Sequence, residues 1–163
     1  MLLRDATEHD LGAILAITND VIATSTAMYV DDPLTLEDRA TWFAARRRLG
    51  YPVLVAEEAG RVLGFSSFGD FRPFPGYRHT VEHSVHVHAD ARGQGVGPKL
   101  VTALFPRARA LDKHMMIAAV DAANAGSIRM HAKLGFTEGA VLREVGRKFD
   151  RWLDLVFMQR RLD

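Results

Sequence analysis

The sequence contains no cysteine, so the chain has no disulfide, no thiolate metal ligand and no cysteine nucleophile. It also lacks any hydrophobic run near the ~18 residues that a membrane span requires. Neither charge dominates, because 21 lysines and arginines face 20 aspartates and glutamates, for a net charge of +1. We therefore expect neither a nucleic-acid partner nor a membrane partner.

What remains is the composition of an ordinary globular protein. Hydrophobic residues make up 48% and charged residues 25%, which excludes disorder and fibrous repeats. No linker, low-complexity tract or internal repeat divides the chain, so we expect a single domain over residues 1–163. Because Met1–Asp5 run directly into a predicted charged helix, we expect no secretory signal. A cytoplasmic enzyme or ligand-binding protein is the class that these features favour.

Hydrophobic periodicity predicts a mixture of helices and strands. The predicted helices cover residues 7–22, 32–49, 96–110 and 127–134. The predicted strands cover residues 52–58, 61–69, 80–87, 114–120, 136–144 and 152–160. Pro106 lies inside one helix and predicts a kink or an early end there. Helices around a central, mostly antiparallel sheet give an α+β fold.

A glycine-rich segment, Arg92-Gly93-Gln94-Gly95-Val96-Gly97-Pro98-Lys99, joins a predicted strand to a predicted helix. Glycine lets the backbone turn sharply, and amides exposed at a helix N-terminus suit a phosphate. A dinucleotide fingerprint would need glycine at Pro98, and an ATP-binding loop would need Gly-Lys-Ser/Thr at residues 97–99. Neither pattern is present. A plain connecting turn is the alternative to a phosphate site.

The pattern Arg92-x-x-Gly95-x-Gly97 resembles the pyrophosphate loop of the GNAT acyltransferases. A second segment follows in the expected order, because Asn124-Ala125-Gly126-Ser127 through Leu134-Gly135-Phe136 is similar to the superfamily's helix and Gly-Phe motif. The resemblance implies the GNAT fold, in which a mostly antiparallel mixed sheet is flanked by helices. It also implies acetyl-CoA as the co-substrate, held by the glycine loop.

Further segments narrow the resemblance to the phosphinothricin and methionine sulfoximine N-acetyltransferases. They are Trp42-Phe43, Gly50-Tyr51-Pro52 and residues 69–74, 80–85 and 151–155. The resemblance implies acetylation of the α-amino group of a small amino acid or analogue, by direct attack of the amine on the thioester. It further implies a homodimer. Three residues depart from the family pattern and bear on the acceptor pocket or the dimer contacts: Thr18, His86 and Asp150.

Acyl transfer to an amine requires a base for the amine, a donor for the oxyanion and an acid for the departing thiolate. Glu82 is the predicted base, because strand alternation places it on one face with Ser84 and His86, just before the glycine loop. A solvated glutamate in a surface ion pair is the alternative. The resemblance implies that the backbone of residues 85–87 borders the thioester and supplies the oxyanion donor.

His131 lies four residues before Gly135, where many superfamily members carry a tyrosine that serves as the acid. An imidazole titrates near ~6.5 and can protonate a thiolate, whereas an exposed histidine without a role is the alternative. The resemblance assigns Asn124 to the pantetheine and Lys133 to the phosphates. The predicted coenzyme-binding residues are Val85, His86, Val87, Arg92, Gly93, Gln94, Gly95, Val96, Gly97, Pro98, Asn124 and Lys133.

The segment 70–78 carries arginines among aromatic residues and is the predicted site for the carboxylate of the acceptor. A guanidinium binds a carboxylate at two points, and aromatic walls suit a short side chain. A proline-stiffened surface loop with local arginine pairing is the alternative. With the family's substrate segment added, the predicted acceptor-binding residues are Met28, Tyr29, Arg72, Pro73, Phe74, Glu82, His83 and Ser84.

Four histidines, at positions 79, 83, 86 and 88, raise the question of a metal site. Strand alternation separates His83 from His86 and His88, and no carboxylate completes three ligands on one face, so we expect no metal. Two other functions stay open. One is acetylation of another small amine or of a protein N-terminus, and the other is a non-enzymatic acyl-CoA sensor. The sequence does not name the physiological acceptor.

Overall fold

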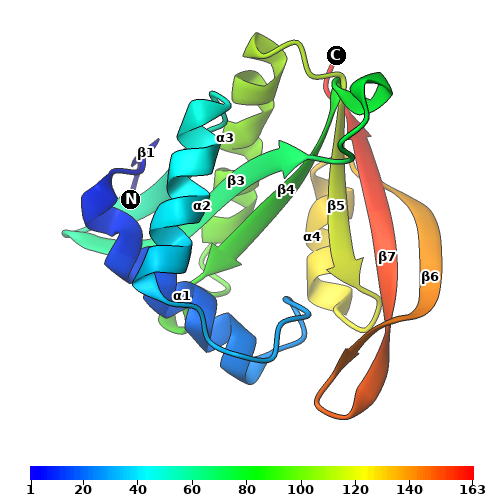
Figure 1. Cartoon of the computed structure of the whole chain (residues 1–163), viewed down its shortest axis with the longest axis horizontal. Coiled ribbons are helices and arrows are strands. Elements are labelled where there is room, and N and C mark those ends of the chain that lie inside the picture. The colour runs from blue at the N-terminus through cyan, green and yellow to red at the C-terminus, as the bar shows by residue number, and fades with distance from the viewer.

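The structure, a computed structural model, describes all residues 1–163. Its strands form one 7-stranded sheet in the order β1-β2-β3-β4-β5-β7-β6 (Figure 1). The strands are β1 (Leu2–Asp5), β2 (Val53–Glu58), β3 (Arg61–Asp70), β4 (Thr80–Val87), β5 (Met115–Asp121), β6 (Thr137–Lys148) and β7 (Arg151–Arg161). Only β4 and β5 are parallel neighbours, and every other pair is antiparallel. The predicted mixed, mostly antiparallel sheet is confirmed.

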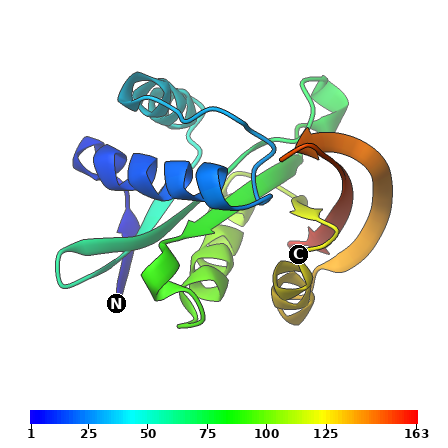
Figure 2. The ribbon, with the colours of Figure 1, turned by 90° about the horizontal axis from the view of Figure 1, so that it is seen from below.

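Helices cover both faces of this sheet. They are α1 (Leu11–Thr24), α2 (Leu36–Arg48), α3 (Val96–Ala110) and α4 (Ala125–Lys133). Figure 2 shows α1 and α2 on one side of the sheet and α3 and α4 on the other. Successive side chains of β2 point to opposite faces of the sheet. Val53 and Val55 therefore join the apolar cluster beneath α1 and α2, while Leu54 and Ala56 join the larger cluster beneath α3. None of the helices has the length and apolar content that crossing a membrane requires.

One strand was not predicted, because residues Leu2–Asp5 form an edge strand paired with β2. Pro106 was expected to kink its helix or to end it early, and α3 does not end there but continues to Ala110. Burial explains this continuation: Phe105 and Ala108, on either side of the proline, pack into the core and hold the last turn in place.

The feature that positions the site is a divergence of β4 from β5. Their ladder pairs Thr80–His83 with Met115–Ala118 and then stops, although β4 continues to Val87 and β5 to Asp121. Figure 1 shows the two strands spreading apart beyond this point. Along an antiparallel ladder, alternate residues direct their N–H and C=O groups away from the paired neighbour. The last residues of β4 therefore present backbone hydrogen-bonding groups toward the divergence.

Candidate active site

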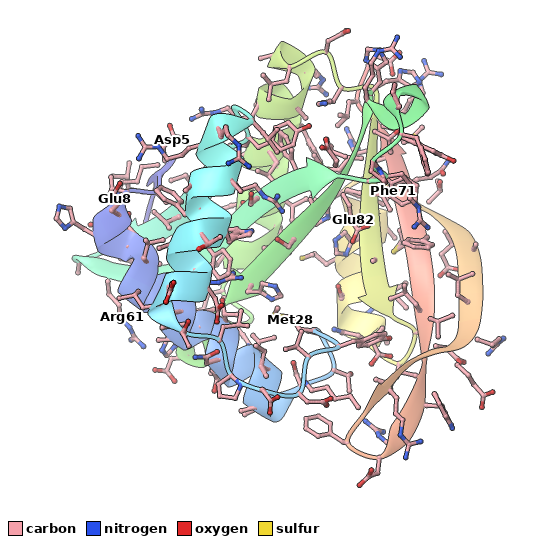
Figure 3. All side chains as sticks on the ribbon, in the orientation of Figure 1. Asp5, Glu8, Met28, Arg61, Phe71 and Glu82 are labelled. Carbon is pink, nitrogen blue, oxygen red and sulfur yellow. The ribbon has the colours of Figure 1, made fainter.

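A cavity of about 370 Å³ lies where β4 and β5 diverge, and we call it the acceptor cavity. Figure 3 shows Glu82 on β4 and Met28 on the segment after α1, both near the middle of the molecule. The walls of the acceptor cavity come from β4, β5, β7, α4 and the segment after α1. The lining residues are Thr26, Ala27, Met28, Tyr29, Glu82, His83, Ser84, Val85, His86, Ala118, Ala119, Val120, Asp121, Asn124, Ser127, His131 and Leu155.

A second cavity, of about 680 Å³, runs along the glycine-rich turn, and we call it the coenzyme groove. None of the backbone N–H groups from Gly93 to Gly97 donates to a backbone carbonyl. Gly93 and Gly95 have φ of 76° and 78°, in the left-handed region that favours glycine, and Gly95 is the N-cap of α3. Free amides at a helix N-terminus are a ready-made phosphate site. The turn is therefore suited to the diphosphate of a coenzyme.

The acceptor cavity and the coenzyme groove are continuous. They share the lining residues Ala27, Val85, His86, Asn124 and Ser127. A molecule whose phosphates rest on the glycine turn can thus extend an arm along β4 to the place where the strands diverge. The Asn124 side chain accepts a hydrogen bond from the Ser127 amide at 3.0 Å and caps α4 at this junction. The two cavities together have the shape expected for two ligands that meet beside β4.

Glu82 borders the acceptor cavity and is half-buried. Burial raises the pKa of its carboxyl above the usual range, while the positive charge of Arg72 acts in the opposite direction. The Arg72 guanidinium lies 5.1 Å from the centre of the Phe71 ring, at the end of β3. A carboxylate that is partly removed from water and titrates closer to neutrality is a better proton acceptor than a solvated glutamate. Glu82 therefore has the environment of a general base.

His131 is buried and forms a hydrogen-bonded pair with His83. Its Nδ1 lies 2.8 Å from the Ser127 carbonyl oxygen, which can only accept, so Nδ1 carries the proton. The Nε2 of His131 must then accept from the Nε2–H of His83, 3.0 Å away. Burial lowers the pKa of both imidazoles, that of His83 to about 3, so the pair is neutral. His131 is 2% exposed, which excludes the alternative of an exposed surface histidine.

This arrangement leaves His131 without a free proton that points toward the coenzyme groove. Its ring borders the acceptor cavity alone, whereas Ser127 borders both cavities. The Ser127 hydroxyl lies 3.3 Å from His131 Nδ1. Because both imidazoles are neutral, the pair has no acidic proton to give, and the hydroxyl that lies at the junction of the two cavities is that of Ser127, a residue that the sequence did not single out for chemistry.

The other predicted residues divide into two groups. Met28, Tyr29 and Ser84 line the acceptor cavity, and the residues of the glycine turn other than Gln94 line the coenzyme groove. The structure does not bring the remaining predicted residues into either lining: Arg72, Pro73, Phe74, Gln94 and Lys133. Phe74 is 68% exposed. Arg72 does not line the acceptor cavity, but its positive charge lowers the pKa of Glu82, which does.

Asp121 is a cavity residue that the sequence analysis missed. It ends β5 and is 6% exposed, and one carboxylate oxygen accepts from the Ala123 amide at 2.9 Å. The other oxygen, Oδ2, is buried without a partner in the chain. The only sequence signal was a carboxylate at the end of an otherwise apolar strand. Its place in the cavity depends on the divergence of β5 from β4, which the local sequence does not encode.

The chain is similar to known acetyltransferases in sequence and in structure. Residues 14–136, a span that includes the glycine turn, Glu82 and His131, match the Acetyltransferase (GNAT) family. The L-methionine sulfoximine/L-methionine sulfone acetyltransferase of Pseudomonas aeruginosa is 52% identical over 99% of this chain and 94% of its own.

Two solved structures share the fold over nearly their full lengths. An acetyltransferase from Salmonella typhimurium, solved with its cofactor acetyl-CoA, has a TM-score of 0.97 and 48% identity over 99% of this chain and 94% of its own. A ribosomal-protein-alanine N-acetyltransferase from Brucella melitensis also has a TM-score of 0.97 and 48% identity, and the match covers 99% of both chains. The names of the Pseudomonas aeruginosa relative and the Brucella melitensis structure imply different acceptors.

Proposed function

Because this chain belongs to the GNAT acetyltransferase family, we propose that it transfers the acetyl group of acetyl-CoA to the α-amino group of a small amino acid or amino-acid analogue. The observation that carries the proposal is the continuity of the coenzyme groove with a small acceptor cavity bordered by Glu82. The name of the Pseudomonas aeruginosa relative indicates the acceptor class, namely methionine sulfoximine and methionine sulfone. These compounds combine an α-amine with a short polar side chain.

Each step of the transfer is assigned to a residue of the two cavities. When bound, acetyl-CoA supplies an activated acyl group as a thioester. Glu82 accepts the proton of the acceptor ammonium and leaves a free amine for direct attack. A backbone N–H of residues 85–87, at the divergence of β4 from β5, donates to the oxyanion. As the intermediate collapses, the Ser127 hydroxyl donates its proton to the departing thiolate and regains one from the attacking nitrogen, which loses its second proton as the amide forms. His131 lies 3.3 Å from this hydroxyl and orients it. Asn124 and the glycine turn orient the coenzyme.

Arg72 serves the acceptor from outside the cavity lining. Its charge acts on Glu82 and lowers the pKa of that carboxyl, and a guanidinium suits the α-carboxylate of an amino acid. Phe74 and Pro73 extend from the same segment, which is exposed as it stands. We infer that this segment contacts the acceptor when the cavity is filled, which would remove Phe74 from solvent.

We also infer that the protein is a homodimer that acts in the cytoplasm, where acetyl-CoA is available. The hairpin of β6 and β7 forms an edge of the sheet. It carries exposed apolar side chains on β6, in the turn and at the start of β7, namely Val141, Leu142, Val145, Phe149 and Trp152. Exposed apolar side chains at a sheet edge are typical of a site of self-association.

The test is a thiol-release assay with purified protein and acetyl-CoA. We expect turnover with methionine sulfoximine and methionine sulfone, and less or none with a peptide that begins with alanine. A preference for the peptide would support the second candidate, a protein N-terminal acetyltransferase. The name of the Brucella melitensis structure favours this candidate. A thermal shift with acetyl-CoA but no thiol release with any amine would overturn the proposal in favour of an acyl-CoA sensor.

A further inference from the structure

One wall of the acceptor cavity has no regular structure of its own. Residues 25–29 follow the end of α1 and belong to no helix or strand, yet residues 26–29 all line the cavity. Such a segment keeps a defined shape only if contacts from other elements hold it, because ordering the backbone of each residue costs about 1–2 kcal/mol. The contacts that hold this wall come from the β6–β7 hairpin, which lies more than a hundred residues away in the sequence.

Lys148, the last residue of β6, makes the first of these contacts. It is 2% exposed, and its ammonium donates to three backbone carbonyls. The acceptors are Ile22 at 2.6 Å, Ser25 at 2.7 Å and Met28 at 2.9 Å. An ammonium has three protons, so its donor capacity is filled by the end of α1 and the wall segment. The positive charge also lies at the negative end of the α1 dipole.

Tyr29 makes the second contact, at the other end of the wall. A Cβ added to Gly146 would lie 2.3 Å from the Tyr29 ring, so the ring rests directly on the backbone of β6. The Tyr29 hydroxyl donates to the carbonyl oxygen of Asp154 on β7 at 3.1 Å. Both ends of the wall are thus fastened to the same hairpin, by a buried cation at one end and by a stacked aromatic ring at the other.

We infer that Lys148 and Gly146 are positioning residues that set the acceptor side of the cavity through the segment 25–29. Neither residue lines the acceptor cavity or the coenzyme groove, so neither touches a substrate. A buried lysine without a carboxylate partner is costly, and here the carbonyls of Ile22 at the end of α1 and of Ser25 and Met28 in the wall stabilise it. The inference rests on the proposed function, because the cavity that the wall closes is taken to bind the acceptor amine.

The test replaces Lys148 with methionine, which keeps most of the side-chain volume and removes the three donors. We expect the KM for the acceptor to rise roughly tenfold or more, which corresponds to about 1.4 kcal/mol of binding free energy. We expect kcat and the KM for acetyl-CoA to change by less than about threefold, since Glu82 and the glycine turn are untouched. Amide hydrogen exchange in residues 25–29 should become faster.

Gly146→Ala tests the same connection without a change of charge. Its backbone has no positive φ, so alanine fits the strand, but the new Cβ displaces the Tyr29 ring. We expect the same split, in which the acceptor KM rises while kcat is retained. Arg48→Met is the control, because it removes one positive charge from the exposed end of α2. It should leave both KM values and the exchange rates unchanged.

Two results would overturn the inference. One is an unchanged acceptor KM in both Lys148→Met and Gly146→Ala. The other is faster exchange throughout the chain with equal losses in both KM values, which would show a general loss of stability. If Lys148→Met does not fold, Gly146→Ala decides alone. Failure of the proposed function gives a different result, namely a wild-type protein that releases no thiol with any amine.

Discussion

Glu82 lies at the boundary between the paired and the diverging parts of β4. It is still in register with Ile117 of β5, and the ladder stops one residue later, after His83. Its backbone is therefore held on both sides, by β3 and by β5. Its side chain borders the cavity, where partial burial raises the pKa of the carboxyl. The position combines a rigid main chain with an environment that strengthens the base.

Glu82→Gln should lower kcat by about 10²–10⁴-fold, the usual contribution of a general base. The Kd for acetyl-CoA should not change, because the glycine turn is untouched. The base must be ionised to work, so kcat/KM of the wild type should fall as the pH falls through the Glu82 pKa. Because that pKa is raised, the inflection should lie above 4.5, the ordinary value for glutamate. Pre-steady-state and steady-state rates across pH would measure both effects.

The matched control is Glu37→Gln, at an exposed position in the first turn of α2. It should keep the wild-type kcat and the same pH profile. Near-normal turnover of Glu82→Gln at every pH would remove Glu82 from the mechanism.

The histidine pair shows how a residue assigned from sequence can change its role in the structure. As the direct acid, His131 would need a proton on the nitrogen that faces the thiolate. Instead, Nδ1 donates to the Ser127 carbonyl and Nε2 accepts from His83. The hydroxyl of Ser127, which borders both cavities, is then the better placed proton donor. The Ser127 carbonyl fixes the tautomer of His131, which in turn requires His83, predicted to bind the acceptor, to donate from its Nε2.

At the scale of elements, the strand-turn-helix unit from β4 to α3 contains the predicted coenzyme site. The turn from Gly93 to Gly97 needs left-handed backbone at two positions and leaves its amides free for phosphate. The left-handed backbone affects stability, because any side chain at Gly93 or Gly95 would strain it. The free amides affect coenzyme binding. The effect on stability and the effect on binding can be measured separately.

Gly95→Ala and Gly50→Ala form a matched pair for this purpose. Gly95 has φ of 78° and Gly50 has φ of 71°, and an added Cβ meets nothing within 4 Å at either position. Each substitution should lower the free energy of unfolding by about 1–2 kcal/mol through left-handed strain. Only Gly95→Ala should also raise the KM for acetyl-CoA, since Gly50 lies at the end of α2, outside the groove.

Urea denaturation and steady-state kinetics measure the two effects separately. Equal changes in the acetyl-CoA KM for both variants would mean that backbone strain alone is responsible. An unchanged KM in Gly95→Ala would argue against a phosphate site at this turn.

At the scale of the whole molecule, the β6–β7 hairpin has two different faces. On one side of the hairpin, Lys148 donates to the Met28 carbonyl in the wall of the acceptor cavity. Trp152 and Val145 of the same hairpin are exposed to solvent. If a second copy covers the exposed side, association of two chains would also stabilise the hairpin that holds the cavity wall. Self-association and acceptor binding would then be linked through one element.

Trp152→Glu combined with Val145→Glu should convert a dimer into a monomer of about 18.1 kDa in sedimentation experiments. Two charges placed in an apolar interface would remain desolvated and unpaired, which is strongly unfavourable. Leu36→Glu is the control, because Leu36 is 55% exposed on α2, away from the hairpin. It should sediment like the wild type. A wild-type protein that sediments as a monomer would refute the homodimer.

The sequence by itself determined most elements and predicted the coenzyme half of the site. Helices and strands follow from the local period of apolar residues, and the glycine turn is a contiguous motif whose geometry depends on neighbouring residues. The family resemblance identified from these motifs is confirmed by the match over residues 14–136. The β1 strand was missed because four residues are too short for a periodic signal, and its pairing partner lies about fifty residues away.

Only the tertiary structure decided how the acceptor half is assembled. Asp121 and Ser127 reach the cavity because β4 and β5 stop pairing at His83, and Lys148 reaches the segment after α1 across more than a hundred residues. Contacts of this kind depend on where separate elements meet in space, and no local pattern of residue types records them. Local chemistry is therefore legible in the sequence, whereas a site built from distant segments requires the fold.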